Sequence, residues 1–234
     1  ARHDRVVWGY AAAAMRRGVH VIQGTPVTGL LRDGNRVTGV ETPGGPIRAG
    51  VVLSAVGGNV TALAGQAGVR LPIRTHPLQA FVTNGYAEDF GPILSDTELL
   101  CYASQTGRGQ MLVGAEFDPQ PSYSLRSSFS FLQSASAKIV HLLPFMRDLR
   151  ILRQWSGICD ISADFSPILG ATGVDGFLVT TGWGTWGFKA IPAGGEAMAE
   201  VIATGRTPDL IAPFALGRFA ADHVLADQGS TGTR

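Results

Sequence analysis

The residues best suited to chemistry lie in the segment 180–205, where Gly184 and Gly187 precede Lys189. A glycine turn that leads into a helix directs backbone N–H groups and the positive end of the helix dipole toward an anion or an electron-rich ring. Glycines would let such a ring approach the backbone closely, and Lys189 adds a positive charge. An ordinary strand-to-helix turn with an exposed lysine fits the same pattern, so both interpretations stay open at this point.

Two elements must position this turn. Residues 176–182 form a short apolar run between glycines, which predicts a buried strand. After the turn, Ile191 and Ile202 belong to a set of small and apolar residues at helical spacing. Pro192 is tolerated in a first helical turn, and Gly205 is a stop signal. We therefore expect a strand, a glycine turn and a helix, in that order.

The segment before residue 72 predicts a small α/β arrangement. Apolar spacing predicts an amphipathic helix that Asp4 caps and Gly18 ends. Residues 19–24 predict a short strand of the kind buried in a parallel sheet. Turn signals at 33–34 and 44–45 predict a three-stranded antiparallel meander. Its last run, 51–58, reads as a strand that re-enters a core and ends in a tight turn, and 59–67 as a short helix.

A second sheet is expected to begin at Pro72. Strands are predicted at 72–82, around Ile93, at 99–103, at 111–115 and at 149–158. Apolar residues from Leu125 to Leu143 predict a helix between the last two strands. A polar tail is expected after the closing helix.

Composition excludes several classes of protein. The chain has 234 residues, of which 45% are hydrophobic and 16% charged, and its net charge is +1. These values are typical of a globular chain and argue against a nucleic-acid-binding surface or an acidic-membrane binder. There is no apolar run of membrane-spanning length and no signal peptide. Cys101 and Cys159 are isolated, which favours a reducing, cytoplasmic location.

No motif for nucleophilic or metal chemistry stands out. The histidines are scattered, and we see no catalytic Ser/His/Asp order, metal-ligand spacing or P-loop. A site made of glycine turns and one lysine is typical of a protein that leaves the hard chemistry to a cofactor. The dinucleotide pattern GxGxxG is nevertheless not expected here, because Gly57 and Gly58 do not open a βαβ unit.

Several segments, in order along nearly the whole chain, resemble the beta subunit of heterotetrameric sarcosine oxidase, a family of D-amino-acid-oxidase-like FAD enzymes. Among them are ARHDRVVWGYA, LRQWSGICDISADFSPILG and GWGTWGFKAIPAGG. The family begins with a Rossmann half that carries GxGxxG, and this chain opens on Ala-Arg-His-Asp without a methionine. We therefore expect it to be the C-terminal part of a longer beta subunit.

The resemblance implies a fold class of α/β plus α+β. Residues 1–71 would be part of a Rossmann-like FAD-binding domain of the glutathione-reductase type, with a β-meander. Residues 72–160 would be an antiparallel-sheet substrate domain that interrupts it. Residues 161–234 would return to the FAD-binding domain with the closing strand, turn and helix.

The resemblance also implies two flavins and a reaction. FAD, bound non-covalently, would oxidise sarcosine (N-methylglycine) to an imine, which gives glycine and formaldehyde, or methylenetetrahydrofolate when tetrahydrofolate takes part. Electrons would pass to FMN, and oxygen would become hydrogen peroxide. FMN would be attached covalently to His3 within the sequence Arg2-His3-Asp4. The partners would be the other subunits of a hetero-oligomer.

The family's remaining site residues map onto this sequence one by one. Gly184, Thr185 and Gly187 match its FAD-contacting turn, and Val27 matches a position whose backbone touches the adenine. Lys189 would lie against the FAD ring and pair with the substrate carboxylate. Arg153 could hold the FMN phosphate or a structural acid, and it stays unassigned.

Two positions depart from the family pattern. Trp186 replaces a glycine of the usual GWGTGGFK, and Phe165 replaces a small residue. Two bulky aromatic side chains near the expected flavin could narrow the pocket or change which amine fits. Oxidation of another N-alkyl or D-amino acid therefore stays open, as does a non-catalytic scaffold subunit.

Overall fold

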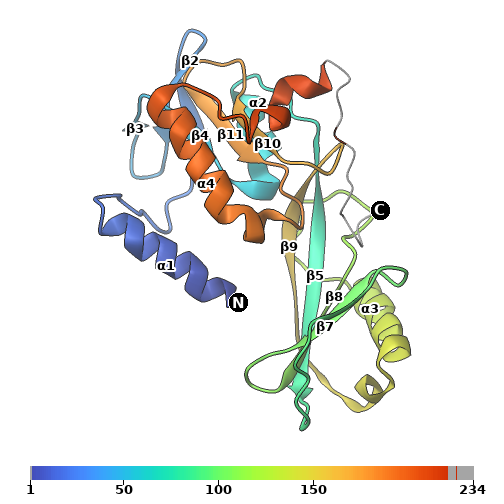
Figure 1. The fold of residues 1–234 in the computed structure, drawn as a ribbon. Coiled ribbons are helices and arrows are strands. Elements are labelled where there is room, and N and C mark those ends of the chain that lie inside the picture. The colour runs from blue at the N-terminus through green and yellow to red at the C-terminus, as the bar shows by residue number, and fades with distance from the viewer. Residues whose placement is uncertain (1, 221–224, 226–234) are drawn as a thin grey trace.

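The computed structural model describes residues 2–220 and residue 225 (Figure 1). The α-helices are α1 (His3–Met15), α2 (Val60–Gln66), α3 (Phe129–Leu142) and α4 (Gly187–Thr204). The strands are β1 (Gly29–Asp33), β2 (Arg36–Glu41), β3 (Ile47–Arg48), β4 (Val52–Ser54), β5 (Ile73–Gly85), β6 (Leu94–Asp96), β7 (Cys101–Gln105), β8 (Gln110–Ala115), β9 (Ile151–Ser162), β10 (Ile168–Ala171) and β11 (Phe177–Thr181). Short 3-10 helices are η1 (Gly57–Asn59), η2 (Pro144–Asp148), η3 (Ala212–Phe214) and η4 (Leu216–Phe219).

The predicted meander is present. Strands β1, β2 and β3 form an antiparallel sheet in that order. Gly34 forms the first turn with φ 56°, a left-handed conformation that glycine adopts without strain. The apolar run that follows leaves this sheet, because β4 pairs in parallel with β11. The chain then turns at Gly57, the first residue of η1, whose φ is 53°.

A mixed sheet carries the closing strand and helix. Its order is β10-β11-β4, with β10 antiparallel to β11 and β4 parallel to it. Helix α4 packs on this sheet through a cluster that includes Leu169, Ala197 and Met198. Gly205 ends the helix with φ 72°, so the expected stop is confirmed.

The expected second sheet is a five-stranded antiparallel sheet of order β6-β7-β8-β5-β9. Two of its strands, β5 and β9, pair from Ile73 to Thr83 of β5 and run from the mixed sheet down to the hairpin of β7 and β8 (Figure 1). Helix α3 covers this end through a core that includes Phe81, Met111 and Ile139. Ser128 caps α3, since its hydroxyl accepts a hydrogen bond from the Phe131 N–H at 3.1 Å.

Four details of the sequence-based expectation are wrong. Residues 19–24 form no strand, because Val19, Val21 and Ile22 are exposed and no described strand pairs with them. Asp4 does not cap α1; the N-cap is Arg2, and Asp4 lies in the first turn. The other two concern helix limits: α3 begins four residues after Leu125, and Pro192 lies in the second turn of α4 because that helix begins at Gly187. Strand β10 was not foreseen.

Within residues 2–220 and 225, no helix combines the length and the apolar character needed to cross a membrane. Of the polar tail expected after α4, residues 221–224 and 226–234 lie outside the described residues. The division at residues 71 and 160 stays a prediction, although β9 continues beyond the second boundary to Ser162.

Candidate functional site

The turn between β11 and α4 is built around the carboxylate of Asp160, a buried residue of β9. Its Oδ2 accepts hydrogen bonds from the Thr181 hydroxyl at 2.7 Å and from the Gly182 N–H at 2.6 Å. The Gly184 N–H donates to the Asp160 carbonyl at 3.1 Å. Gly182 and Gly184 have φ values of 69° and 51°, which favour glycine. Asp160 therefore fixes the path of the turn onto the antiparallel sheet.

Trp183 packs against the first turns of α4. Its indole N–H donates to the Thr180 hydroxyl at 2.9 Å. A Cβ added to Gly187 would lie 3.1 Å from Trp183 Cβ, and one added to Gly194 would lie 3.0 Å from the ring. Both glycines therefore have a packing role that is independent of any ligand.

The glycines Gly182, Gly184 and Gly187 satisfy the pattern GxGxxG between a strand and a helix, so the absence of that pattern expected from the sequence is wrong. In a dinucleotide cradle, the loop N–H groups face the pyrophosphate. Here the N–H groups of Gly182 and Gly184 donate to Asp160 instead. The buried Asp160 carboxylate would also repel a phosphate. This turn is therefore unsuited to a pyrophosphate.

The positive end of the α4 helix dipole is not neutralised by side chains at the start of the helix. No side chain caps it at Trp186, and its first turn contains no acidic residue. The first-turn N–H groups have no intrahelical acceptors, which leaves them free for a ligand. Lys189 is exposed, and its Nζ lies 4.0 Å from the centre of the Trp186 ring. The ammonium thus rests on an aromatic ring.

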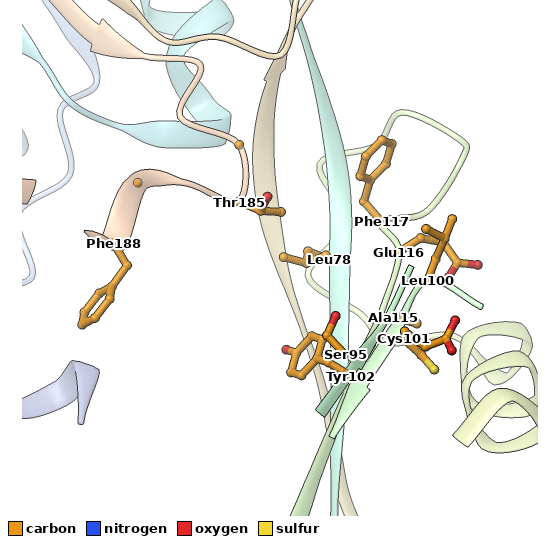
Figure 2. Close-up of a pocket in the computed structure, with 13 residues that line it drawn as sticks. Leu78, Ser95, Leu100, Cys101, Tyr102, Ala115, Glu116, Phe117, Thr185 and Phe188 are labelled. Carbon is orange, nitrogen blue, oxygen red and sulfur yellow. The ribbon is translucent and has the colours of Figure 1, made fainter. Parts of the chain in front are cut away.

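A cavity of about 500 Å³ separates the turn from the antiparallel sheet. In Figure 2, Thr185 points from the turn toward Leu78, Tyr102 and Ser95 lie below it, and Phe188 points away. The lining combines apolar walls with a few polar groups: Leu78, Ser95, Asp96, Leu100, Cys101, Tyr102, Ala115, Glu116, Phe117, Gly184, Thr185, Gly187 and Phe188. Such a lining is typical of a small-molecule site.

The two carboxylates in this lining already have partners. Glu116 extends toward α3 (Figure 2), where the Lys138 ammonium donates to both of its oxygens at 2.5 Å. Asp96 Oδ1 accepts from the N–H groups of Glu98 and Leu99 at 2.9 and 2.7 Å. Burial raises the pKa of the Tyr102 phenol, which therefore stays protonated near neutral pH.

The structure brings only part of the predicted site together. Gly184, Thr185 and Gly187 line the cavity, and Lys189 follows directly but does not line it. His3 is exposed at the start of α1, a helix in which no residue is buried. The three residues left are Val27, exposed just before β1, Arg153, exposed on β9, and Phe165, which lines a separate cavity of about 590 Å³ with His76 and Phe117.

Asp160 and Tyr102 are the site residues that the sequence did not predict. The available signal for Asp160 is an acidic residue among the apolar residues Ile158, Cys159 and Ile161.

The profile of the FAD-dependent oxidoreductase (DAO) family matches residues 1–201. The chain belongs to this family. It is 40% identical over 232 residues to sarcosine oxidase subunit beta of Rhodobacter capsulatus and 38% identical over 230 residues to that of Arthrobacter sp.. These alignments cover 99% and 98% of this chain but only 56% and 57% of the relatives. The chain therefore spans little more than half of their length.

Solved structures of other oxidoreductases share the fold. L-proline dehydrogenase from P. horikoshii superposes with a TM-score of 0.85 at 27% identity, covering 92% of this chain and 59% of that one. Glycine oxidase from Geobacillus kaustophilus superposes with a TM-score of 0.78 at 23% identity, covering 88% and 55%. The relatives confirm the expected resemblance, and the structure confirms the expected antiparallel sheet. The sheet that carries the closing strand is mixed.

FAD is the cofactor that this family implies. The donor set beside the cavity suits its ring end, because uncapped helix N–H groups and a nearby ammonium favour an electron-rich ring and the cavity walls are apolar. The pyrophosphate has no comparable cradle at this turn. The described residues therefore fit one end of FAD.

Proposed function

We propose that this chain is part of the beta subunit of a cytoplasmic, multi-subunit flavin oxidase that demethylates sarcosine. The products would be glycine, hydrogen peroxide and formaldehyde, or methylenetetrahydrofolate where tetrahydrofolate takes up the one-carbon unit. The observation that carries the proposal is the cavity between the antiparallel sheet and the turn before Lys189. The similarity to subunits named sarcosine oxidase beta supports the choice of substrate.

When bound, FAD supplies the two-electron acceptor for oxidation of the substrate C–N bond. Gly184, Thr185 and Gly187 would contact its ring from the turn, and the backbone at Val27 would contact the adenine. A preceding Rossmann half with its own GxGxxG would hold the pyrophosphate. In this assembly, residues 1–71 and 161–234 would belong to the FAD-binding domain, and residues 72–160 would form the substrate domain.

Lys189 would bind the substrate carboxylate. It follows Gly187 and Phe188, which line the cavity, and its flexible side chain can turn toward it. A carboxylate beside an ammonium gains a charge-assisted hydrogen bond, and this bond is stronger where apolar walls such as Leu78 and Phe117 exclude water. The positive end of α4 adds to the same attraction. Lys189 would thus orient the amine end of the substrate toward the ring.

Covalent attachment of FMN to His3 belongs to the same proposal. Arg2 and Asp4 on either side of it bind each other at 2.6 Å, and His3 is exposed. An imidazole nitrogen at a helix start is therefore available for a bond to the 8α-methyl carbon. The FMN would be shared with a partner subunit.

The test of the proposal is turnover of sarcosine by the full-length complex, followed by peroxide detection. Loss of a charged hydrogen bond of about 1.5–3 kcal/mol predicts that Lys189→Ala lowers kcat/KM roughly 10- to 100-fold, mainly by raising KM. Arg206→Ala removes an exposed charge beyond the other end of α4 and should leave both constants unchanged. An unchanged kcat/KM in Lys189→Ala would refute the role of Lys189.

A second candidate is oxidation of another N-alkyl or D-amino acid. The superposition with an L-proline dehydrogenase at 27% identity favours a secondary amino acid in general over sarcosine in particular. Turnover of sarcosine, N-ethylglycine, L-proline and a D-amino acid by the same complex separates these substrates. A scaffold without activity would oxidise none of them and would lack a GxGxxG half upstream.

A further inference from the structure

The contact between Lys189 and Trp186 has a consequence for ligand binding. The two residues lie three positions apart at the start of α4, so their side chains share one side of the helix. The ammonium nitrogen lies 4.0 Å from the ring centre, well inside the range of a cation–π contact. Within residues 2–220 and 225, Lys189 makes no ion pair with a carboxylate, whereas Lys138 is bound to Glu116. The ring is thus the partner that holds the Lys189 ammonium.

The position of the Lys189 ammonium over the Trp186 ring lies outside the cavity. Gly187 and Phe188 line the cavity, but neither Trp186 nor Lys189 is among its lining residues. A carboxylate in the cavity can therefore bind the Lys189 ammonium only if the ammonium moves off the ring.

We infer that Trp186 is a specificity-determining residue that competes with the substrate carboxylate for Lys189, an inference that rests on the proposed role of Lys189. The ring contact is lost when the carboxylate binds, so it weakens the binding of carboxylates and leaves that of neutral ligands unchanged. A cation–π contact at an exposed site corresponds to about a two- to fivefold change in affinity. The contact with Trp186 thus lowers the affinity with which any carboxylate ligand binds Lys189.

The experiment measures binding rather than turnover. The full-length protein with its cofactor is titrated calorimetrically with acetate, a carboxylate that has no amine to oxidise. Trp186→Ala and Trp186→Gly should each lower the dissociation constant of acetate about two- to fivefold. Glycine is a better N-cap than alanine, so agreement between the two variants separates the ring effect from a helix-end effect. Trp186→Phe keeps a weaker ring and should lie between these variants and the unaltered protein.

A double-mutant cycle with Lys189→Met completes the test. In the Lys189→Met background, Trp186→Ala should no longer change the affinity for acetate, and acetamide should bind all variants equally. If Lys189→Met alone leaves acetate binding unchanged, the proposed role of Lys189 fails. If Lys189→Met weakens binding while Trp186→Ala does not strengthen it, only the competition is overturned. If Trp186→Ala strengthens acetate binding in the Lys189→Met background as well, the competition is also overturned. The Trp186 ring would then weaken acetate binding through its size and not through its contact with Lys189.

Discussion

Two neighbouring glycines of α4 differ in what surrounds them. A Cβ on Gly194 would lie 3.0 Å from the Trp183 ring, whereas one on Gly195 would meet no atom within 4 Å. The ring cannot easily move, because its N–H is bound to Thr180. Gly195→Ala should therefore raise the free energy of unfolding by about 0.5–1 kcal/mol through helix propensity.

Gly194→Ala gains the same propensity but overpacks the ring. We expect its free energy of unfolding to lie about 1–3 kcal/mol below that of Gly195→Ala in urea unfolding of the full-length protein. Equal stabilities of the two variants would show that the Trp183 ring yields and that Gly194 is not needed for packing.

At the scale of elements, a buried ion pair ties the turn between β9 and β10 to η4. Arg218 donates from Nε and Nη2 to the Asp164 carboxylate at 2.8 and 2.9 Å, and the side chains are 4% and 2% exposed. Removing one partner leaves a buried charge unpaired, so Arg218→Ala should lower the free energy of unfolding by about 3–5 kcal/mol. Arg2→Ala, which breaks the exposed pair with Asp4, should leave it nearly unchanged and is the matched control.

The same pair makes stability depend on pH. Burial alone raises the pKa of the Asp164 carboxyl, but hydrogen bonds from Arg218 and from the Leu225 and Ser166 N–H groups outweigh burial and lower the pKa. A lowered pKa in the folded state stabilises the protein fully above the unfolded value of about 4, and this stabilisation is lost as pH falls through the folded pKa. Without Arg218, burial raises the pKa of the Asp164 carboxyl, so the deficit of Arg218→Ala should be largest near neutral pH and shrink on acidification. A deficit independent of pH down to 2 would contradict this account.

The elements that sequence predicted well are those with local signals. The left-handed glycines Gly34 and Gly205 mark the ends of elements within a few residues of the pattern that predicts them. Strand β10 pairs with the next strand, β11, but its four residues carry no local pattern that marks them as a strand. Whether residues 19–24 form a strand depends on a partner strand, and no local pattern reports such a partner. The site shows the same contrast. The turn at Gly184 and Gly187 can be predicted from the local sequence. Asp160 is recognisable as its anchor only once β9 lies beside it.

For the whole molecule, the second flavin is the most demanding prediction. Arg2 and Asp4 bind each other, and within the described part of the chain the His3 imidazole makes no hydrogen bond. Helix α1 has no buried residue, so nothing in this part of the chain shields the imidazole from a flavin held by a partner subunit. We expect FMN to remain on the peptide that contains His3 after the full-length complex is denatured and digested.

The variants separate attachment at His3 from attachment elsewhere. His3→Asn should release all FMN on denaturation while FAD binding is retained, because the two proposed flavins would occupy different sites. His20→Asn changes another exposed histidine of the same region and should keep the FMN on the peptide. Mass spectrometry of the digested peptides reads the result directly. Free FMN in the supernatant of the unaltered protein would refute covalent attachment, and FMN retained by His3→Asn would place the attachment away from His3. Either result would leave the turn before Lys189 as the part of the proposed flavin site that this chain contributes.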